Sequence, residues 1–130
     1  MNSEIADYLH RVRQPFNVNL PAQHGALAAL DDEEHYDKTM DLTREGIAWL
    51  TREISALGCR VFDTHTNFFL VDVGMDCRKL YEQMLGKGVI IRPMAAYDYP
   101  SYIRITVGLP EENSRLVKTL AEALAELRVG

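Results

Sequence analysis

One long amphipathic stripe constrains what this chain can fold into more than any other feature. Its members recur at alternating steps of four and three residues, at Tyr36, Met40, Thr43, Ile47, Leu50, Ile54 and Leu57. This spacing places them along one face of a single helix. Gly58 follows the last of them, where a residue with positive φ can end a helix. We expect a helix over residues 34–57 that packs on a core rather than in a coiled coil, because it spans only about three heptads.

The pattern changes to that of strands after this helix. Short runs rich in β-branched and aromatic side chains predict four strands, at residues 59–63, 67–73, 89–92 and 102–107. Within the second run, Phe68 to Val71 is apolar on both strand faces, so we expect a central strand covered on both sides.

Two further helices are expected between and after the strands. Asp76 can cap one that ends near Gly86 or Gly88, and Pro110 suits the first position of the other. The last helix has a buried stripe at Leu116, Leu120, Leu124 and Leu127. Short links between the paired strands favour antiparallel neighbours. The fold class is therefore α+β: a largely antiparallel sheet with helices packed on it, preceded by the long amphipathic helix.

The N-terminal segment, residues 1–33, reads as a separate helical region and connector ahead of a domain over residues 34–130. A helix is expected over residues 4–12, with Ser3 as its cap and Pro15 as its stop. An extended connector follows to Pro21, and a short helix from Ala22 to Leu30.

Composition excludes several functional classes. The 130 residues include 14 Lys+Arg and 19 Asp+Glu, a net charge of −5, and no dense basic run, which argues against nucleic-acid binding. No apolar run is long enough to span a bilayer, and the acidic start is unlike a signal peptide. Cys59 and Cys77 show no CxxC pattern, so we expect free thiols in a cytoplasmic protein. The four histidines lack metal-ligand spacing, and no metal site is expected.

Two arginines in the last strands are the strongest candidates for binding. In residues 102–107, Arg104 and Thr106 share one face, and in residues 89–92, Ile90 and Arg92 share one. If these strands pair as a hairpin, both guanidinium groups can lie on the same face. Two adjacent cations suit an anion, because the guanidinium fork matches a carboxylate or phosphate. Solvated arginines, or partners for Asp72 and Asp98, are the alternatives.

The loop between these strands and the common catalytic motifs add little. Residues 93–101 hold Tyr97 and Tyr99 beside two prolines, a composition equally suited to the roof of a ligand site and to an ordinary surface. The chain contains no GxSxG, GxGxxG or Walker sequence, and neither cysteine has an evident base nearby. The residues alone do not form a complete catalytic set.

Four runs resemble one enzyme family. They are YLHRVRQPFNVN (residues 8–19), TNFFLVDV (66–73), GVIIRPM (88–94) and YIRITVGLPEEN (102–113). In their order and spacing, they resemble histidinol-phosphate aminotransferase over nearly the whole chain. Relatives that act on aromatic amino acids or threonine phosphate share parts of this pattern.

The resemblance implies a dimeric fold-type-I enzyme that uses pyridoxal phosphate. Such an enzyme moves an amino group between histidinol phosphate and 2-oxoglutarate in histidine biosynthesis. By motif position, Arg104 is implied to grip the substrate carboxylate and Arg92 to contact the phosphate of histidinol phosphate. Asn17 is implied to lie near the active-site entrance, with a turn-capping role as the alternative. Residues 1–33 would belong to the large domain and dimer interface, and residues 34–130 to the small domain.

The sequence departs from the family in its lysines. The family's Schiff-base lysine follows a serine in the large domain. None of the four lysines here, Lys38, Lys79, Lys87 and Lys118, has those surroundings. We therefore expect the substrate-side part of the enzyme, with no catalytic residue of its own and no pyridoxal phosphate bound to this chain alone.

Two other interpretations remain open. The chain could be a stand-alone module that binds an anionic metabolite through Arg92 and Arg104, or a piece that restores activity when combined with the rest of the enzyme. Without the rest of the enzyme, apolar residues near the N-terminus would lack cover, which would favour a homo-oligomer or a loosely ordered N-terminal segment. These residues are Phe16, Leu20, Leu27 and Leu30.

Overall fold

The computed structural model describes residues 2–13, 16 and 18–129. The chain divides into two compact units, residues 1–37 and 38–130. Asn17, one of the expected binding residues, lies outside the described residues. Within the described part of the chain, no helix has both the length and the apolar character needed to cross a bilayer.

The larger unit contains an antiparallel sheet whose strands lie in the order β1-β2-β4-β3. The strands are β1 (Arg60–Val61), β2 (Phe68–Asp72), β3 (Arg92–Pro93) and β4 (Tyr102–Thr106). Because β2 and β4 are the central pair, the last strand in sequence lies inside the sheet, between β2 and the edge strand β3. This order brings β3 directly beside β4, as a hairpin requires.

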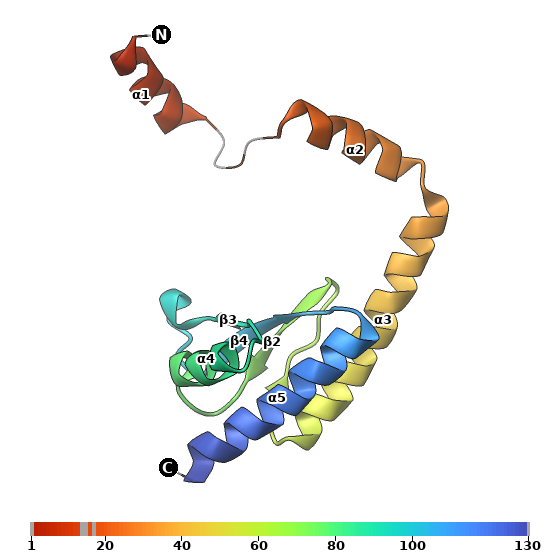
Figure 1. Cartoon of the computed structure of the whole chain (residues 1–130), viewed down its shortest axis with the longest axis vertical. Coiled ribbons are helices and arrows are strands. Elements are labelled where there is room, and N and C mark those ends of the chain that lie inside the picture. Colours follow the sequence, from red (N-terminus) through yellow and green to blue (C-terminus); the bar gives the residue numbers. More distant parts are fainter. Residues whose placement is uncertain (1, 14–15, 17, 130) are drawn as a thin grey trace. The chain divides into compact units, whose positions relative to one another are not determined.

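Three helices cover one face of this sheet (Figure 1). They are α3 (Glu33–Ala56), α4 (Cys77–Gly86) and α5 (Pro110–Val129). Their apolar side chains and the inward side chains of the strands form one core, whose fully buried members include Leu50, Ile54, Val71, Leu80, Met84, Ile103, Ile105, Leu120 and Leu124. The expected α+β class, with helices on an antiparallel sheet, is confirmed.

The central strand β2 is covered on one face only, which corrects the expectation of cover on both. Phe69 and Val71 point into the core and are almost fully buried. Phe68, on the other face, keeps 38% of its surface exposed. The apolar run predicts a strand that is buried on both faces, but Phe68 and Leu70 belong to a face that carries no helix in this unit.

The edge strands are shorter than predicted. The run 89–92 gives a strand only from Arg92, because the Val89 amide donates to the carbonyl of Met84 at 2.9 Å and so belongs to the end of α4. The run 59–63 pairs over Arg60–Val61. Sequence patterns locate a strand well but set its ends poorly, since pairing partners decide where a ladder stops.

The long helix ends as predicted but buries only part of its stripe. Gly58 has φ of 82°, the left-handed conformation that closes α3. Leu50 and Ile54 are fully buried, whereas Tyr36 is 61% exposed. The first part of the stripe therefore has no core to pack on within the described residues. Asp76 caps α4, as expected, by accepting from the Arg78 amide at 2.9 Å.

The smaller unit contains two helices, α1 (Ser3–Val12) and α2 (Leu20–Leu30), neither of which buries a residue. Asn2, not Ser3, caps α1 by accepting from the Glu4 amide at 2.8 Å. Asn19 caps α2 in the same way, so Pro21 lies in the first turn of α2 rather than in a connector. Asn19 is a stronger helix cap than the apolar residue that follows it, which explains the earlier start of α2.

Candidate functional site

The strand register places the two candidate arginines side by side. Arg92 in β3 is directly opposite Arg104 in β4. Directly opposed residues of an antiparallel pair point to the same face of a sheet. The hairpin pairing on which a shared face depended is therefore present, and both side chains lie on one face, while their role in binding stays a prediction.

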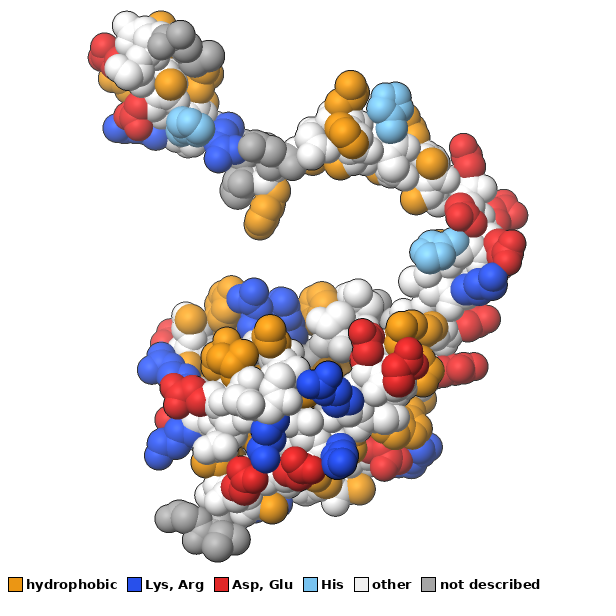
Figure 2. All heavy atoms as spheres, viewed as in Figure 1, with side chains coloured by type: hydrophobic (Ala, Val, Ile, Leu, Met, Phe, Trp, Pro, Cys, Tyr) orange, Lys and Arg blue, Asp and Glu red, His pale blue; other side chains and the backbone are white. Residues whose placement is uncertain are grey.

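This face is the one without helices, and we refer to it as the open face. Alternation along the strands gives its members as Arg60, Phe62, Phe68, Leu70, Asp72, Arg92, Tyr102, Arg104 and Thr106. On the side seen in Figure 2, basic, acidic and hydrophobic side chains are interspersed over the larger unit. The open face carries three arginines and one aspartate, so it is locally cationic on a chain whose net charge is −5.

Arg104 is partly buried and lies against an aromatic ring. Its guanidinium carbon is 4.9 Å from the centroid of the Phe68 ring. Leu70 is its direct neighbour on β2. The apolar stem of an arginine packs well against such side chains while its charged head stays accessible.

Neither arginine of the pair has a carboxylate partner among the described residues, so the alternative that they pair with Asp72 and Asp98 is wrong. The Asp72 side chain instead accepts from the Gly74 amide at 3.0 Å, in the turn after β2. Two adjacent cations without a counter-charge repel each other, and an anion bound between or beside them would relieve that repulsion.

Both arginines line a hollow of 520 Å³ at the β3 edge of the sheet. Its other lining residues are Tyr81, Ile90, Ile91, Pro93, Ile105, Thr106 and Leu116. The hollow combines apolar walls with two positive charges, which suits a small organic anion.

The loop between β3 and β4 does not roof this hollow. It contains a short 3₁₀ helix, η1 (Ala95–Tyr97), followed by Asp98 with φ of 63°. Pro93 lines the hollow, whereas Tyr97 and Tyr99 are not among its lining residues, which favours the surface alternative for these two tyrosines. Tyr99 packs edge-on against Tyr102, with 5.3 Å between ring centroids.

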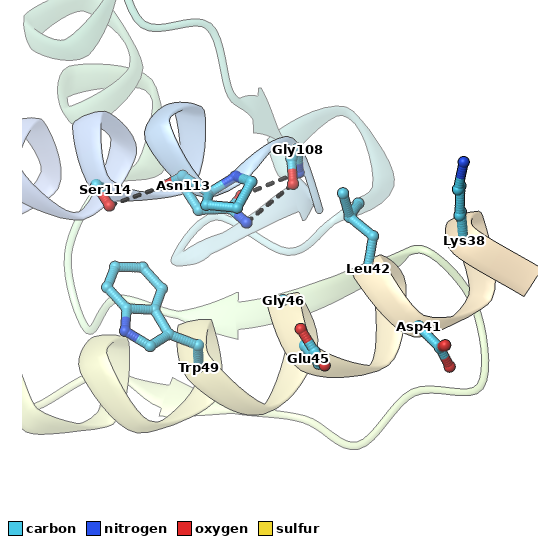
Figure 3. Close-up of a pocket in the computed structure, with 10 residues that line it drawn as sticks. Lys38, Asp41, Leu42, Glu45, Gly46, Trp49, Gly108, Asn113 and Ser114 are labelled. Atoms are coloured by element: carbon cyan, nitrogen blue, oxygen red, sulfur yellow. Dashed lines mark hydrogen bonds between the residues drawn. The ribbon is translucent and has the colours of Figure 1, made fainter.

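A second hollow of 720 Å³ lies between α3 and the start of α5 (Figure 3). Trp49 extends from α3 toward Asn113 and Ser114 of α5. The Asn113 side chain bonds through both its oxygen and its nitrogen: Oδ1 accepts from the Gly108 amide at 2.9 Å, and Nδ2 donates to the Gly108 carbonyl at 3.0 Å. The Ser114 hydroxyl donates to the Pro110 carbonyl. These polar groups support the turn into α5 and leave little to recognise a ligand.

The described lysines do not fit a Schiff-base role. Such a lysine needs an amine that readily loses its proton. Hydrogen bonding to Glu126 instead raises the pKa of Lys87, which also lies 3.5 Å from a Glu122 carboxylate oxygen. The other three, Lys38, Lys79 and Lys118, are exposed on helices.

The remaining chemistry-bearing residues are dispersed. Among the described residues, no three metal-donor side chains come together. Cys59 and Cys77 are both buried and unpaired, and burial raises the pKa of the Cys59 thiol, which keeps it protonated and unreactive.

The two-layer α+β unit is found in a known class of enzyme. A family model described as "Aminotransferase class I and II" matches residues 1–123, and the chain belongs to that family. Its curated relatives include "Histidinol-phosphate aminotransferase" of Desulfotalea psychrophila, 56% identical over 98% of this chain and 34% of the relative. The protein of the same name in Nitratidesulfovibrio vulgaris strain Hildenborough is 41% identical over 92% of this chain and 32% of the relative. The chain thus spans about a third of the length of these relatives.

Solved structures show the same fold. The histidinol-phosphate aminotransferase of Sinorhizobium meliloti, solved in complex with pyridoxal-5'-phosphate, matches with a TM-score of 0.77 at 23% identity, over 95% of this chain and 35% of that chain. The corresponding enzyme of Clostridium acetobutylicum matches with a TM-score of 0.76 at 23% identity, over 96% of this chain and 39% of that chain.

Proposed function

We propose that this chain supplies the substrate-binding small domain of a histidinol-phosphate aminotransferase of histidine biosynthesis. The observation that carries the proposal is the register that sets Arg92 opposite Arg104 without a carboxylate partner among the described residues. The name of the relative at 56% identity supplies the substrate. Two buried unpaired thiols are compatible with the reducing cytoplasm, where this pathway would operate.

The two arginines would bind different anionic groups. Arg104, held against Phe68, would bind the carboxylate of 2-oxoglutarate or glutamate. Arg92, which is more exposed, would bind the phosphate of histidinol phosphate. Each guanidinium can form two parallel charge-assisted hydrogen bonds to such a group.

The catalytic group would come from outside these 130 residues. Pyridoxal phosphate would supply the amino-transfer chemistry on a lysine of the rest of the enzyme. We therefore expect no transamination when this chain alone is incubated with pyridoxal phosphate, histidinol phosphate and 2-oxoglutarate. Turnover, or a stoichiometric lysine adduct trapped by borohydride and located by mass spectrometry, would contradict this part of the proposal.

A chimera tests the binding roles. This chain replaces the matching third of the Desulfotalea psychrophila relative, and turnover is measured for both substrates. Loss of a charge-assisted contact costs about 1.5–3 kcal/mol, so Arg92→Ala should raise KM for histidinol phosphate about ten- to hundred-fold. Arg104→Ala should do the same for 2-oxoglutarate. Arg60→Ala, on the same face and away from the pair, is the matched control and should change neither value.

The stand-alone binding module is the second candidate, because the arginine pair lies wholly within the compact unit 38–130. Calorimetric titration of the unfused chain with histidinol phosphate separates the two. Binding that is lost in both Arg92→Ala and Arg104→Ala would favour the module. Absence of binding, together with an active chimera, would favour the small-domain role.

A further inference from the structure

We infer that Phe68 is a positioning residue for Arg104: its ring holds the guanidinium in place without neutralising it. The inference rests on the proposed role of Arg104 in binding an anion. Nothing in the family comparison assigns a function to this phenylalanine.

The register explains how Phe68 reaches Arg104. On β2 and β4, Phe68 is opposite Thr106 and Leu70 is opposite Arg104. Phe68 is therefore the diagonal neighbour of Arg104 on the open face, within reach of a long side chain. The 4.9 Å between the guanidinium carbon and the ring centroid lies within the range of a cation–π interaction.

Core packing does not account for this ring. Its neighbour Phe69 is 2% exposed and belongs to the core, whereas Phe68 is 38% exposed and does not. A large aromatic side chain on the solvent-facing side of a central strand needs another reason. Its contact with Arg104 provides one.

A ring suits this position better than a carboxylate would. An acidic side chain beside Arg104 would hold the guanidinium more firmly, but it would also compete with an anionic ligand for the same donors. The ring attracts the cation through its quadrupole and leaves the N–H groups available. The one carboxylate of the open face, Asp72, accepts a hydrogen bond from the Gly74 amide and lies opposite Tyr102, two pairs along the ladder from Arg104.

The two arginines differ in this respect. Arg92 lies in the two-residue edge strand β3, and among the described residues no aromatic ring lies under it. Arg104 is thus the preorganised member of the pair, and Arg92 is the member free to move toward a ligand. Loss of the Phe68 ring should therefore increase the mobility of the Arg104 side chain and leave that of Arg92 unchanged.

Nuclear magnetic resonance of the full chain tests the inference without a ligand. The ring should shift the Arg104 side-chain Hε resonance upfield and restrict the motion of its Nε–Hε bond. Phe68→Leu should remove both effects, Phe68→Tyr should keep both, and neither variant should change Arg92. Phe62→Leu is the matched control, because the centroid of the Phe62 ring lies 4.7 Å from the guanidinium carbon of Arg60 on the same face. This variant should leave the Arg104 resonance unchanged.

Titration with 2-oxoglutarate then measures the consequence for binding. Loss of a partly exposed cation–π contact should weaken the affinity about five-fold in Phe68→Leu, with recovery in Phe68→Tyr. Unchanged Arg104 Hε position and motion in a folded Phe68→Leu variant would overturn the inference, whether or not an anion binds. Loss of both signatures with unaltered affinity would also overturn it. Absence of any arginine-dependent binding in the wild-type chain would count against the binding role of Arg104 in this chain, and the resonance signatures would then decide the role of Phe68.

Discussion

The open face keeps its central cation without a counter-charge, and this depends on which residue stands at position 68. Phe68→Glu would place a carboxylate next to Arg104, where the two would form an ion pair. We expect the variant to hold Arg104 firmly yet to bind 2-oxoglutarate at least about ten-fold more weakly, since the ligand must displace a charged partner. Calorimetric titration measures the loss. Phe62→Glu, next to Arg60, adds the same charge to the same face and should weaken the binding of 2-oxoglutarate less.

Gly46 shows a residue-scale constraint of another kind, where α3 crosses the end of β4. A Cβ at this position would overlap Cγ1 of Val107 and lie 3.3 Å from Nδ2 of Asn113. Overpacking of this kind costs about 1–3 kcal/mol, so Gly46→Ala should lower the urea midpoint despite the better helix propensity of alanine.

Gly86→Ala is the control for Gly46→Ala. Gly86 is also helical, and a Cβ there would meet nothing within 4 Å. Gly86→Ala should leave the urea midpoint unchanged or raise it slightly. Equal midpoints for the two variants would show that the α3 crossing is looser than the structure indicates.

The sequence was most informative about single residues where the chemistry is local. Gly58 was predicted to adopt positive φ and Asp76 to cap a helix, and both predictions are confirmed. Arg92 and Arg104 were expected to share a face only if their strands pair as a hairpin, and the register meets that condition. The contact between Phe68 and Arg104 was not predicted, because it joins residues 36 positions apart through a register that the sequence could not fix. Alternation alone placed Phe68 in an apolar run and gave no sign of the cation above it.

At the scale of elements, α4 and α5 are joined by one lysine. Nζ of Lys87 lies 2.9 Å from a Glu126 carboxylate oxygen and 3.5 Å from one of Glu122. A hydrogen bond to Glu126 and the charges of both glutamates raise the pKa of Lys87 above its ordinary value of 10.5. The folded state therefore binds this proton more tightly than the unfolded state does.

The sign of the pH dependence follows from this shift. The stabilisation is fully present below pH 10.5 and is lost as the pH rises through the raised pKa. Wild type should have a higher urea midpoint than Lys87→Met at about pH 8, and the difference should shrink at about pH 11.5. Arg115→Met is the control, since Arg115 bonds the Gly88 carbonyl of the same junction and stays charged throughout. A difference that stays constant with pH would contradict the assignment to Lys87.

Element type was easier to predict than element length. The helices and strands of residues 38–130 appear in the predicted order, because apolar side chains recur about every 3.6 residues in a helix and every 2 residues in a strand. The ends of β1 and β3 were missed, since they depend on which backbone groups find partners across the sheet. The one-sided cover of β2 was missed for a related reason: an apolar strand face reads the same whether a helix, a ligand or another domain lies on it.

At the scale of the whole molecule, residues 1–37 contrast with residues 38–130. The larger unit has a core of fully buried side chains, whereas α1 and α2 bury none of their residues. Helices of ten and eleven residues are marginally stable in water without packing. Figure 2 shows hydrophobic side chains on the surface of both helices.

We propose that these helices are covered by a second copy when the chain is alone. On α1, one face carries Ile5, Leu9 and Val12, which are 54%, 51% and 80% exposed. The opposite face carries an ion pair of 2.6 Å between Arg11 and Asp7. An apolar stripe with a polar back is the pattern of a helix that packs on a partner.

Sedimentation velocity across a range of concentrations tests this. The wild-type chain should associate as its concentration rises, because burial of apolar surface drives association. Leu9→Gln combined with Val12→Gln should shift the chain toward monomer, while Arg11→Gln, on the polar face, should not. In the monomeric variant, the amides of α1 should exchange with solvent at nearly unprotected rates, since a helix this short loses its protection along with its partner. A wild-type chain that stays monomeric with α1 protected from exchange would contradict the proposal, because the helix would then be stabilised within one copy.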